Sequence, residues 1–445
     1  MTNPSASKPK KEKLGKKGTF SWALWDWAEQ PFPTIMQTFI FPVFITSAAF
    51  GAESDTSRGL GTASAIAGIF VALIAPILGR RADELGRRKL WLMINSYMLI
   101  AIMAAAYFIQ PSPEFFIFGL ILYGLGGAVQ ESAFINYYAM LKQVSTPGTI
   151  GRISGYAWGL GYVGGIVLLM LSLIGFIQTD NPWLGVGTEN AENIRMVFLL
   201  SAVWMLIFSI PLFRNVPEIS PKPGVGKENI IQSYQKLWQQ IKSLHKQAPE
   251  TLKFLISSAI YRDGLSGVFS FGGVLGALAF GFELADTILF GIAANVVAGI
   301  GAAIGGFIDD RIGSRTTIIV SLTGLILAGS SVFVFASFGP IPYWIGGLAL
   351  TLFVGPAQAA SRTFVARFTP DGREGEAFGL YQTTGRAVSF ISPTLWTVSI
   401  SIALYFGVSS GESAIYGVLG LLLVLVVGLL LLLRVNPNPE VKYSN

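Results

Sequence analysis

The chain has 445 residues, of which 52% are hydrophobic and only 13% are charged. A soluble globular chain carries about 25% charged residues, so most of this surface must face something other than water. The absence of cysteine excludes disulfides and thiolate metal sites, and the single histidine, His245, argues against a histidine-based metal centre.

Twelve apolar segments are each long enough to cross a bilayer, which takes about 20 mostly apolar residues. We expect spans at 20–48, 59–79, 89–109, 114–140, 152–177, 195–213, 252–281, 286–307, 315–338, 341–364, 376–405 and 412–434. The predicted fold class is therefore an all-α membrane protein. Residues 1–19 form a tail whose six lysines suit contact with anionic lipid better than with nucleic acid.

The segment 214–250 is the longest polar interruption and divides the chain into two six-helix bundles, 20–213 and 251–434, followed by a tail at 435–445. Apolar residues recur within it at helical spacing, namely Ile230, Ile231, Tyr234, Leu237, Trp238, Ile241 and Leu244. This pattern predicts an amphipathic helix, lying either on the cytoplasmic membrane surface or against the ends of the bundle.

The basic residues predict the orientation in the membrane. With the N-terminus in the cytoplasm, inward loops hold Arg80, Arg81, Arg87, Arg88, Lys89, Lys142, Arg152, Arg311, Arg315, Arg362, Arg367 and Arg373. The outward loops hold only Arg58 and Arg195. Loops rich in Lys and Arg stay in the cytoplasm, so we expect both termini to be cytoplasmic and the membrane to be the plasma membrane.

A motif of two glycines, an aspartate and an arginine follows span 2 and recurs after span 8. Its members are Gly79, Asp83, Gly86 and Arg88, then Gly306, Asp310, Gly313 and Arg315. The glycines permit close helix approach, and each aspartate can complement the dipole of the helix that follows. We expect both motifs to be conformational latches. Glycines around span 5 also recur around span 11, and two parallel repeats of six spans are the layout of major facilitator transporters.

The residues 79–89 resemble the signature loop of that superfamily. Further strings are Trp25-Asp26-Trp27-Ala28 in span 1, Asp263-Gly264 in span 7 and Gly355-x2-Gln358-Ala359-x-Ser361-Arg362 in span 10. On these the chain is similar to the fungal vacuolar amino-acid effluxer family and its bacterial relatives, over nearly its whole length. The resemblance implies efflux of amino acids or related small solutes. Glu29 and Gln30 depart from the small polar residues usual in that family.

Six ionisable residues lie within predicted spans, where each costs about 2.5–3.5 kcal/mol on insertion scales. They are Asp26, Glu29, Glu131, Arg262, Asp263 and Arg386. Arg386 and Gln382 stand at i and i+4, so they point the same way, and we expect them to hold an anionic group of the substrate. Further candidate substrate contacts are Arg262, Asp26, Glu29 and Gln358.

Glu131 and Asp263 are the candidate proton carriers, because a carboxyl group in a low-dielectric environment can hold a proton at physiological pH. Each assignment has a structural alternative. Asp26 lies about 10 Å inside its helix and fits a pairing group or an interface residue equally. Arg262 and Arg386 fit internal ion pairs that fix helix packing, and Glu131 fits a neutral hydrogen-bond partner.

We therefore expect a monomeric secondary active transporter that moves an amino acid or related organic anion, in the direction of export, by alternating access with protons as a candidate coupling ion. No phosphate-binding loop with a Lys-Ser/Thr pair is present, so ATP is not the expected energy source. A membrane scaffold or receptor that keeps the fold is the alternative. An enzyme is less supported, and neither a cofactor nor a metal is expected.

Overall fold

The computed structural model describes residues 15–179, 181–221, 232, 234, 235, 239, 249–282 and 284–436. Eleven membrane-length apolar helical segments lie within them. Their helices are α3 (Glu53–Leu85), α4 (Arg88–Ala106), α5 (Phe116–Ala139), α7 (Ile150–Ser172), α8 (Glu192–Asn215), α10 (Pro249–Phe280), α11 (Leu284–Ile312), α12 (Ser314–Val334), α13 (Pro340–Phe368), α14 (Glu374–Ala387) with α15 (Ile391–Tyr405), and α17 (Gly417–Leu433). Most of the predicted amphipathic helix and of the basic tail lies outside the described residues.

The first predicted span is the twelfth membrane segment, and it is not one continuous helix. It consists of α1 (Lys16–Glu29), a π-helical segment (Phe32–Phe39) and the short α2 (Phe41–Ile45). Pro31, Pro33 and Pro42 fall at these junctions. Proline removes a backbone donor and clashes with the preceding turn, which is the physical reason for the breaks. All twelve predicted spans are therefore present.

The span predicted at 376–405 is present, but it is not one continuous helix. The span consists of α14 and α15, separated by three residues, 388–390. Pro393 stands in the first turn of α15, four residues after Ser389. A proline ring clashes with the carbonyl four residues earlier, so the continuous helix is interrupted at this position.

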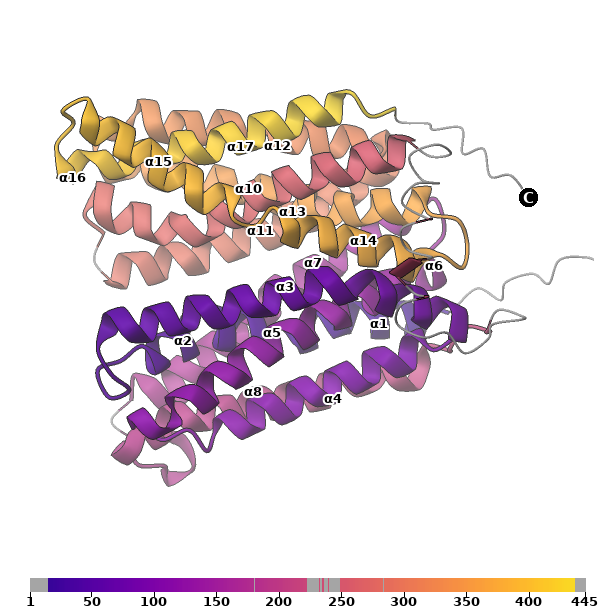
Figure 1. Ribbon diagram of the computed structural model, residues 1–445, viewed down its shortest axis with the longest axis horizontal. Helices are drawn as coiled ribbons and strands as arrows, with labels where there is room; N and C mark the ends of the chain where they lie inside the picture. The colour runs from indigo at the N-terminus through magenta and orange to yellow at the C-terminus, as the bar shows by residue number, and fades with distance from the viewer. Residues whose placement is uncertain are drawn as a thin grey trace, which may run out of the picture.

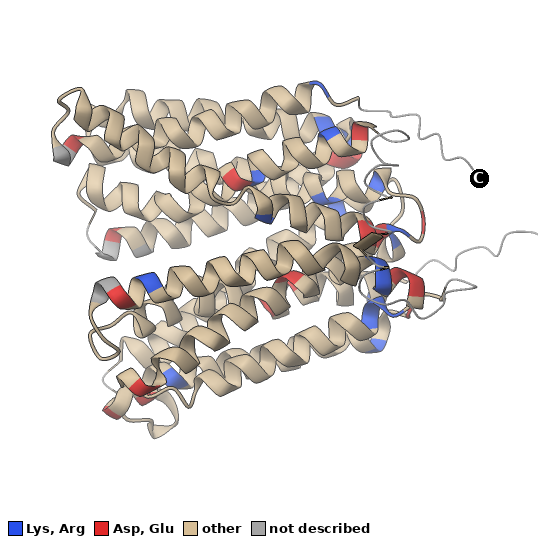
Figure 2. Cartoon of the chain, in the orientation of Figure 1, with Lys and Arg blue, Asp and Glu red and all other residues tan. Residues whose placement is uncertain are grey.

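The helices of both halves run along the long axis, and the two six-helix halves lie side by side across it (Figure 1). In the contacts between them, α3 packs on α14 and α7 packs on α11. The described chain begins at α1 and ends after α17 at one end of the bundle, which we call the terminal end, opposite the far end (Figure 1). Charged residues gather at the terminal end, while the spans toward the far end are mostly uncharged (Figure 2).

Glycines bring the halves together in two equivalent places. A Cβ added to Gly151 in α7 would lie 2.7 Å from the carbonyl oxygen of Gly306 in α11. Gly375 in α14 packs in the same way against Gly79 in α3. Only a residue without a side chain allows backbones to approach this closely. The motif glycines of each half therefore contact the repeated glycines of the other half.

Candidate functional site

At the terminal end, the first motif bridges the two halves. The Asp83 carboxylate accepts hydrogen bonds from the backbone N–H groups of Gly375 (3.0 Å) and Glu376 (3.1 Å) at the start of α14. Arg88 donates to Asp83 and to Glu374, each at 2.6 Å. The expected dipole interaction therefore exists, but the expectation that Asp83 faces the following helix is wrong, because the helix it caps belongs to the opposite half.

The second motif repeats this arrangement with one difference. Asp310 accepts from the backbone N–H groups of Gly151 (2.8 Å) and Arg152 (3.1 Å) at the start of α7. Two cations pair with Asp310, each at 3.2 Å, namely Arg367 on α13 and Arg152 on α7. Arg315, the expected counterpart of Arg88, instead donates to the Leu433 carbonyl within its own half. Among the residues that the structure describes, Arg315 therefore makes no hydrogen bond or ion pair between the halves.

The remaining motif glycines end helices. Gly86 has φ +63° and follows α3, and Gly313 has φ +84° and separates α11 from α12. Residues with a Cβ rarely adopt these left-handed angles, so both positions favour glycine.

Above this layer, Arg362 crosses from α13 into the first half. It was expected at the inward end of span 10, but α13 continues to Phe368 and the Arg362 side chain is 1% exposed. The guanidinium donates to the Ser154 carbonyl oxygen (2.7 Å) and to Asp26 (3.3 Å). Four rings surround it at 5.0–5.7 Å, those of Trp22, Tyr137, Tyr138 and Trp158. Asp26 is thus a pairing group in a sealed layer, which was the structural alternative for it.

Farther along the axis, Glu131 joins the halves a third time. Gln382 and Arg386 on α14 both donate to its carboxylate, so these two side chains do point the same way. Arg386 stands twelve residues after Glu374, about 18 Å from the start of α14, whereas Arg362 is about 9 Å from the terminal end of α13. The Arg386 side chain is nonetheless 32% exposed.

Glu29 lies close to this third layer and is 1% exposed. It accepts a hydrogen bond from Gln130, the neighbour of Glu131 on α5. Within the part of the chain that the structure describes, no cation pairs with Glu29. A buried carboxylate without a cation is costly in a membrane, so Glu29 is the least compensated acid near the centre.

Arg262 and Asp263 lie at the break of span 11. The Arg262 guanidinium stacks 3.6 Å from the centre of the Tyr381 ring and donates to the Tyr381 carbonyl (3.0 Å) and the Gln382 side chain (2.8 Å). Asp263 accepts from the backbone N–H of Ser392 (2.7 Å). Both residues therefore contact span 11 within their own half.

Gln358 lies one helical turn before Arg362 on α13 and is half-buried. Residues at i and i+4 share a helix face, so Gln358 is on the face that meets the first half. It stands about 6 Å farther from the terminal end than Arg362, toward the level of Arg386.

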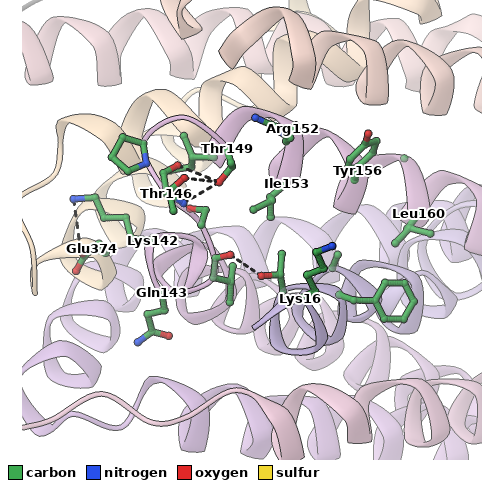
Figure 3. Close-up of a pocket in the computed structure, with 18 of the residues that line it drawn as sticks. Lys16, Lys142, Gln143, Thr146, Thr149, Arg152, Ile153, Tyr156, Leu160 and Glu374 are labelled. Atoms are coloured by element: carbon green, nitrogen blue, oxygen red, sulfur yellow. Dashed lines mark hydrogen bonds and ion pairs between the residues drawn. The ribbon is translucent and has the colours of Figure 1, made fainter. Parts of the chain in front are cut away.

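A cavity of about 1880 Å³ lies at the terminal end, alongside α1, α7 and α11. Lys16, Lys142 and Arg152 line its polar part, and Tyr156 and Leu160 line its apolar part (Figure 3). Its lining includes Asp83, Arg88 and Glu374 of the first motif contact. It does not include the buried pair of Arg362 and Asp26, or the contact of Glu131 with Arg386. This cavity is therefore separate from the group of intramembrane charges.

Sequence reasoning missed Arg362 and Glu374 as partners across the halves. A signal for Arg362 was present, since Asp26 required a cation and Arg362 ends a motif in span 10. No sequence signal pointed to Glu374, because its role depends on how the two halves meet.

Known proteins resemble this chain over most of its length. Residues 142–441 match the family described as vacuole effluxer Atg22 like. An uncharacterized MFS-type transporter of Bacillus subtilis (strain 168), YxiO, is 27% identical over 421 residues, 93% of each chain. Autophagy-related protein 22 of Cryptococcus neoformans var. neoformans serotype D (strain B-3501A) is 25% identical over 311 residues, 64% of this chain and 53% of that protein. The chain thus spans about half the length of this fungal relative.

Solved structures share the fold. The human organic anion transporter MFSD10 (TETRAN) superposes with a TM-score of 0.68 at 14% identity, over 96% of this chain and all of that one. The proton:xylose symporter XylE, a major facilitator protein, superposes with a TM-score of 0.65 at 13% identity, over 93% of each chain. The predicted major facilitator fold is confirmed.

Proposed function

This chain belongs to the Atg22-like vacuole effluxer family of major facilitator transporters, and on that premise we propose that it moves an amino acid or a related organic anion together with a proton. It is a multi-pass membrane transporter and not an enzyme. The terminal end is the cytoplasmic one, because the basic residues gather there. The protein works as a monomer in the plasma membrane, with both termini in the cytoplasm.

The observation that carries the proposal is the exposed ion pair of Arg386 and Glu131. Arg386 stands deep in the membrane, about 18 Å from the start of α14, and is 32% exposed. A guanidinium can grip a carboxylate at two points, and Gln382 adds a further donor. A substrate carboxylate therefore takes the place of Glu131 on Arg386 and Gln382, while Gln358 and the other polar groups at this level complete the site.

Proton coupling follows from this competition. When substrate occupies Arg386, Glu131 loses its cation inside the membrane, and a carboxyl group in that position favours the protonated form. Glu29 already lacks a cation and lies beside Gln130, so it is a second place for the proton. Substrate and proton bind together, so net transport runs in the direction of the proton gradient. Export, the direction predicted from the sequence, then requires a proton gradient directed out of the cytoplasm, and gradients of both signs distinguish export from uptake.

The test is transport by purified protein in proteoliposomes, with amino acids and organic anions as substrates and pH gradients of both signs. We expect Arg386→Ala to lower transport at least about 100-fold, since two charge-assisted hydrogen bonds contribute about 1.5–3 kcal/mol each. Arg386→Lys keeps the charge but loses the planar fork, so partial activity is expected. Arg58→Ala, at an exposed arginine near the start of α3, is the matched control.

A second variant separates substrate binding from a structural ion pair. If Arg386 only neutralises Glu131, then Arg386→Ala combined with Glu131→Gln restores transport, because no orphan charge is left. We expect the double variant to fold with near wild-type thermal stability and to remain inactive. Normal binding and transport by a stable Arg386→Ala protein would refute the proposed site.

A further inference from the structure

The break in span 11 exposes helix ends inside the membrane. The carbonyls in the last turn of α14 and the N–H groups in the first turn of α15 cannot all be satisfied within a helix. Water is scarce at this depth, so other groups must satisfy them. Phe390, at the N-cap position of α15, makes no side-chain cap hydrogen bond.

Asp263 provides that cap from another helix. Its carboxylate accepts the Ser392 N–H at 2.7 Å, in the first turn of α15. Asp263 itself is 6% exposed, so water competes little for this bond. An acid at a helix N-terminus also complements the helix dipole, so Asp263 stabilises α15 in two ways.

Arg262 acts on the other side of the break. It donates to the Tyr381 carbonyl at 3.0 Å and stacks on the Tyr381 ring, six residues before the end of α14. A Cβ on Gly385, in the last turn, would lie 3.2 Å from the Arg262 Nη1 atom. The guanidinium therefore reaches the C-terminal turn of α14, where a cation is favourable, and this glycine makes room for it.

Arg262 also fixes the orientation of the Gln382 amide. The amide oxygen accepts from Arg262 at 2.8 Å, which leaves the amide N–H₂ group to face Glu131. A flipped amide would set two donors against each other. Arg262 thus decides which end of Gln382 meets the anionic group at the centre.

We propose that Arg262 and Asp263 form a clamp on the break of span 11, in which Arg262 positions Gln382 for the substrate and Asp263 caps α15, so that the break is a hinge between α14 and α15. The role of Arg262 rests on the proposed function of Gln382, whereas the cap does not. These roles replace the ones predicted from the sequence, a substrate contact for Arg262 and a proton carrier for Asp263.

Asp263 variants separate a cap from a proton carrier. Asparagine caps a helix about as well as aspartate, whereas alanine does not. We expect Asp263→Asn to keep proton-driven transport within about twofold of wild type, and Asp263→Ala to speed amide hydrogen exchange in residues 388–394 roughly tenfold. Ser266→Ala, at an exposed position on the same helix, should change neither quantity. Loss of proton-driven transport in Asp263→Asn with unchanged exchange would overturn the cap.

Arg262→Lys tests the positioning role. Lysine keeps the charge but cannot stack on Tyr381 and hold Gln382 in one plane. We expect KM to rise roughly tenfold with kcat and hydrogen exchange at 388–394 near wild type. An unchanged KM would overturn the positioning role. If instead Arg386→Ala transports normally while Asp263→Ala still loosens 388–394, the proposed function fails and the cap stands.

Discussion

Neutralising Asp83 should open the terminal end of the protein. Its carboxylate accepts two backbone N–H bonds, from Gly375 and Glu376, and both join the halves. Hydrogen bonds to a charged group contribute about 1.5–3 kcal/mol each, but water replaces them when the end opens and an asparagine keeps one acceptor. A net change of about 2 kcal/mol remains, which shifts the equilibrium roughly 30-fold toward the state open at the terminal end.

Distances between spin labels measure this shift, and the absence of native cysteine makes labelling simple. One label pair at Thr146 and Arg434 reports the terminal end, and another at Gln178 and Ser337 reports the far end. All four are exposed, and each pair joins the two halves. In Asp83→Asn we expect the terminal distance to lengthen and the far distance to shorten.

The matched control is Glu84→Gln, because Glu84 pairs at 2.9 Å with Arg80 on the same helix. It removes the same charge at a neighbouring position and should leave both distances near wild type. Substrate affinity measured with the protein held in one state should change little in Asp83→Asn, since the residue does not contact the site. A large loss of affinity with unchanged distances would refute the latch.

Two further predictions concern topology and the sealed layer. A cysteine introduced at Ser220 should be protected from an impermeant reagent outside the cell while one at Thr188 reacts, and the opposite labelling would reverse the assigned orientation. Arg362→Ala should lower the free energy of unfolding by about 3–5 kcal/mol, because Asp26 is left buried without its cation. Asp26→Asn in the same chain should restore part of the loss in a thermal unfolding measurement, and no recovery would contradict the pairing.

The sequence was sufficient for the twelve spans and the repeat, because both depend on local composition and spacing. It was not sufficient for contacts between distant segments. Asp83 was expected to complement the helix that follows it, since chain proximity was the only guide, and the opposite half supplies that helix instead. Glu131 and Arg386 were both recognised as intramembrane charges, but their pairing required the two halves to be placed together.

The break of span 11 is a different kind of failure, because its cause is visible in the sequence. Pro393 stands inside the predicted span, and a proline four residues after a helical carbonyl breaks or kinks the helix. The span was nevertheless predicted without a break, because its apolar segment is long enough to cross the membrane. Had the break been expected, consecutive Arg262 and Asp263 would have been candidates for its two helix ends, since their charges have the signs that those ends favour.

The exchange of helix caps between the halves explains why the same motif recurs in both halves of the sequence. Asp83 of the first half binds the start of α14, and Asp310 of the second half binds the start of α7. Each aspartate therefore needs a glycine-lined helix start in the opposite half, as at Gly375 and Gly151. A rocking motion that separates the halves at the terminal end breaks both caps together, because each belongs to both halves. Loss of either motif therefore weakens the state that is closed at the terminal end. Closing this end requires both aspartate motifs and both glycine-lined helix starts, and these are the residues that recur along the chain.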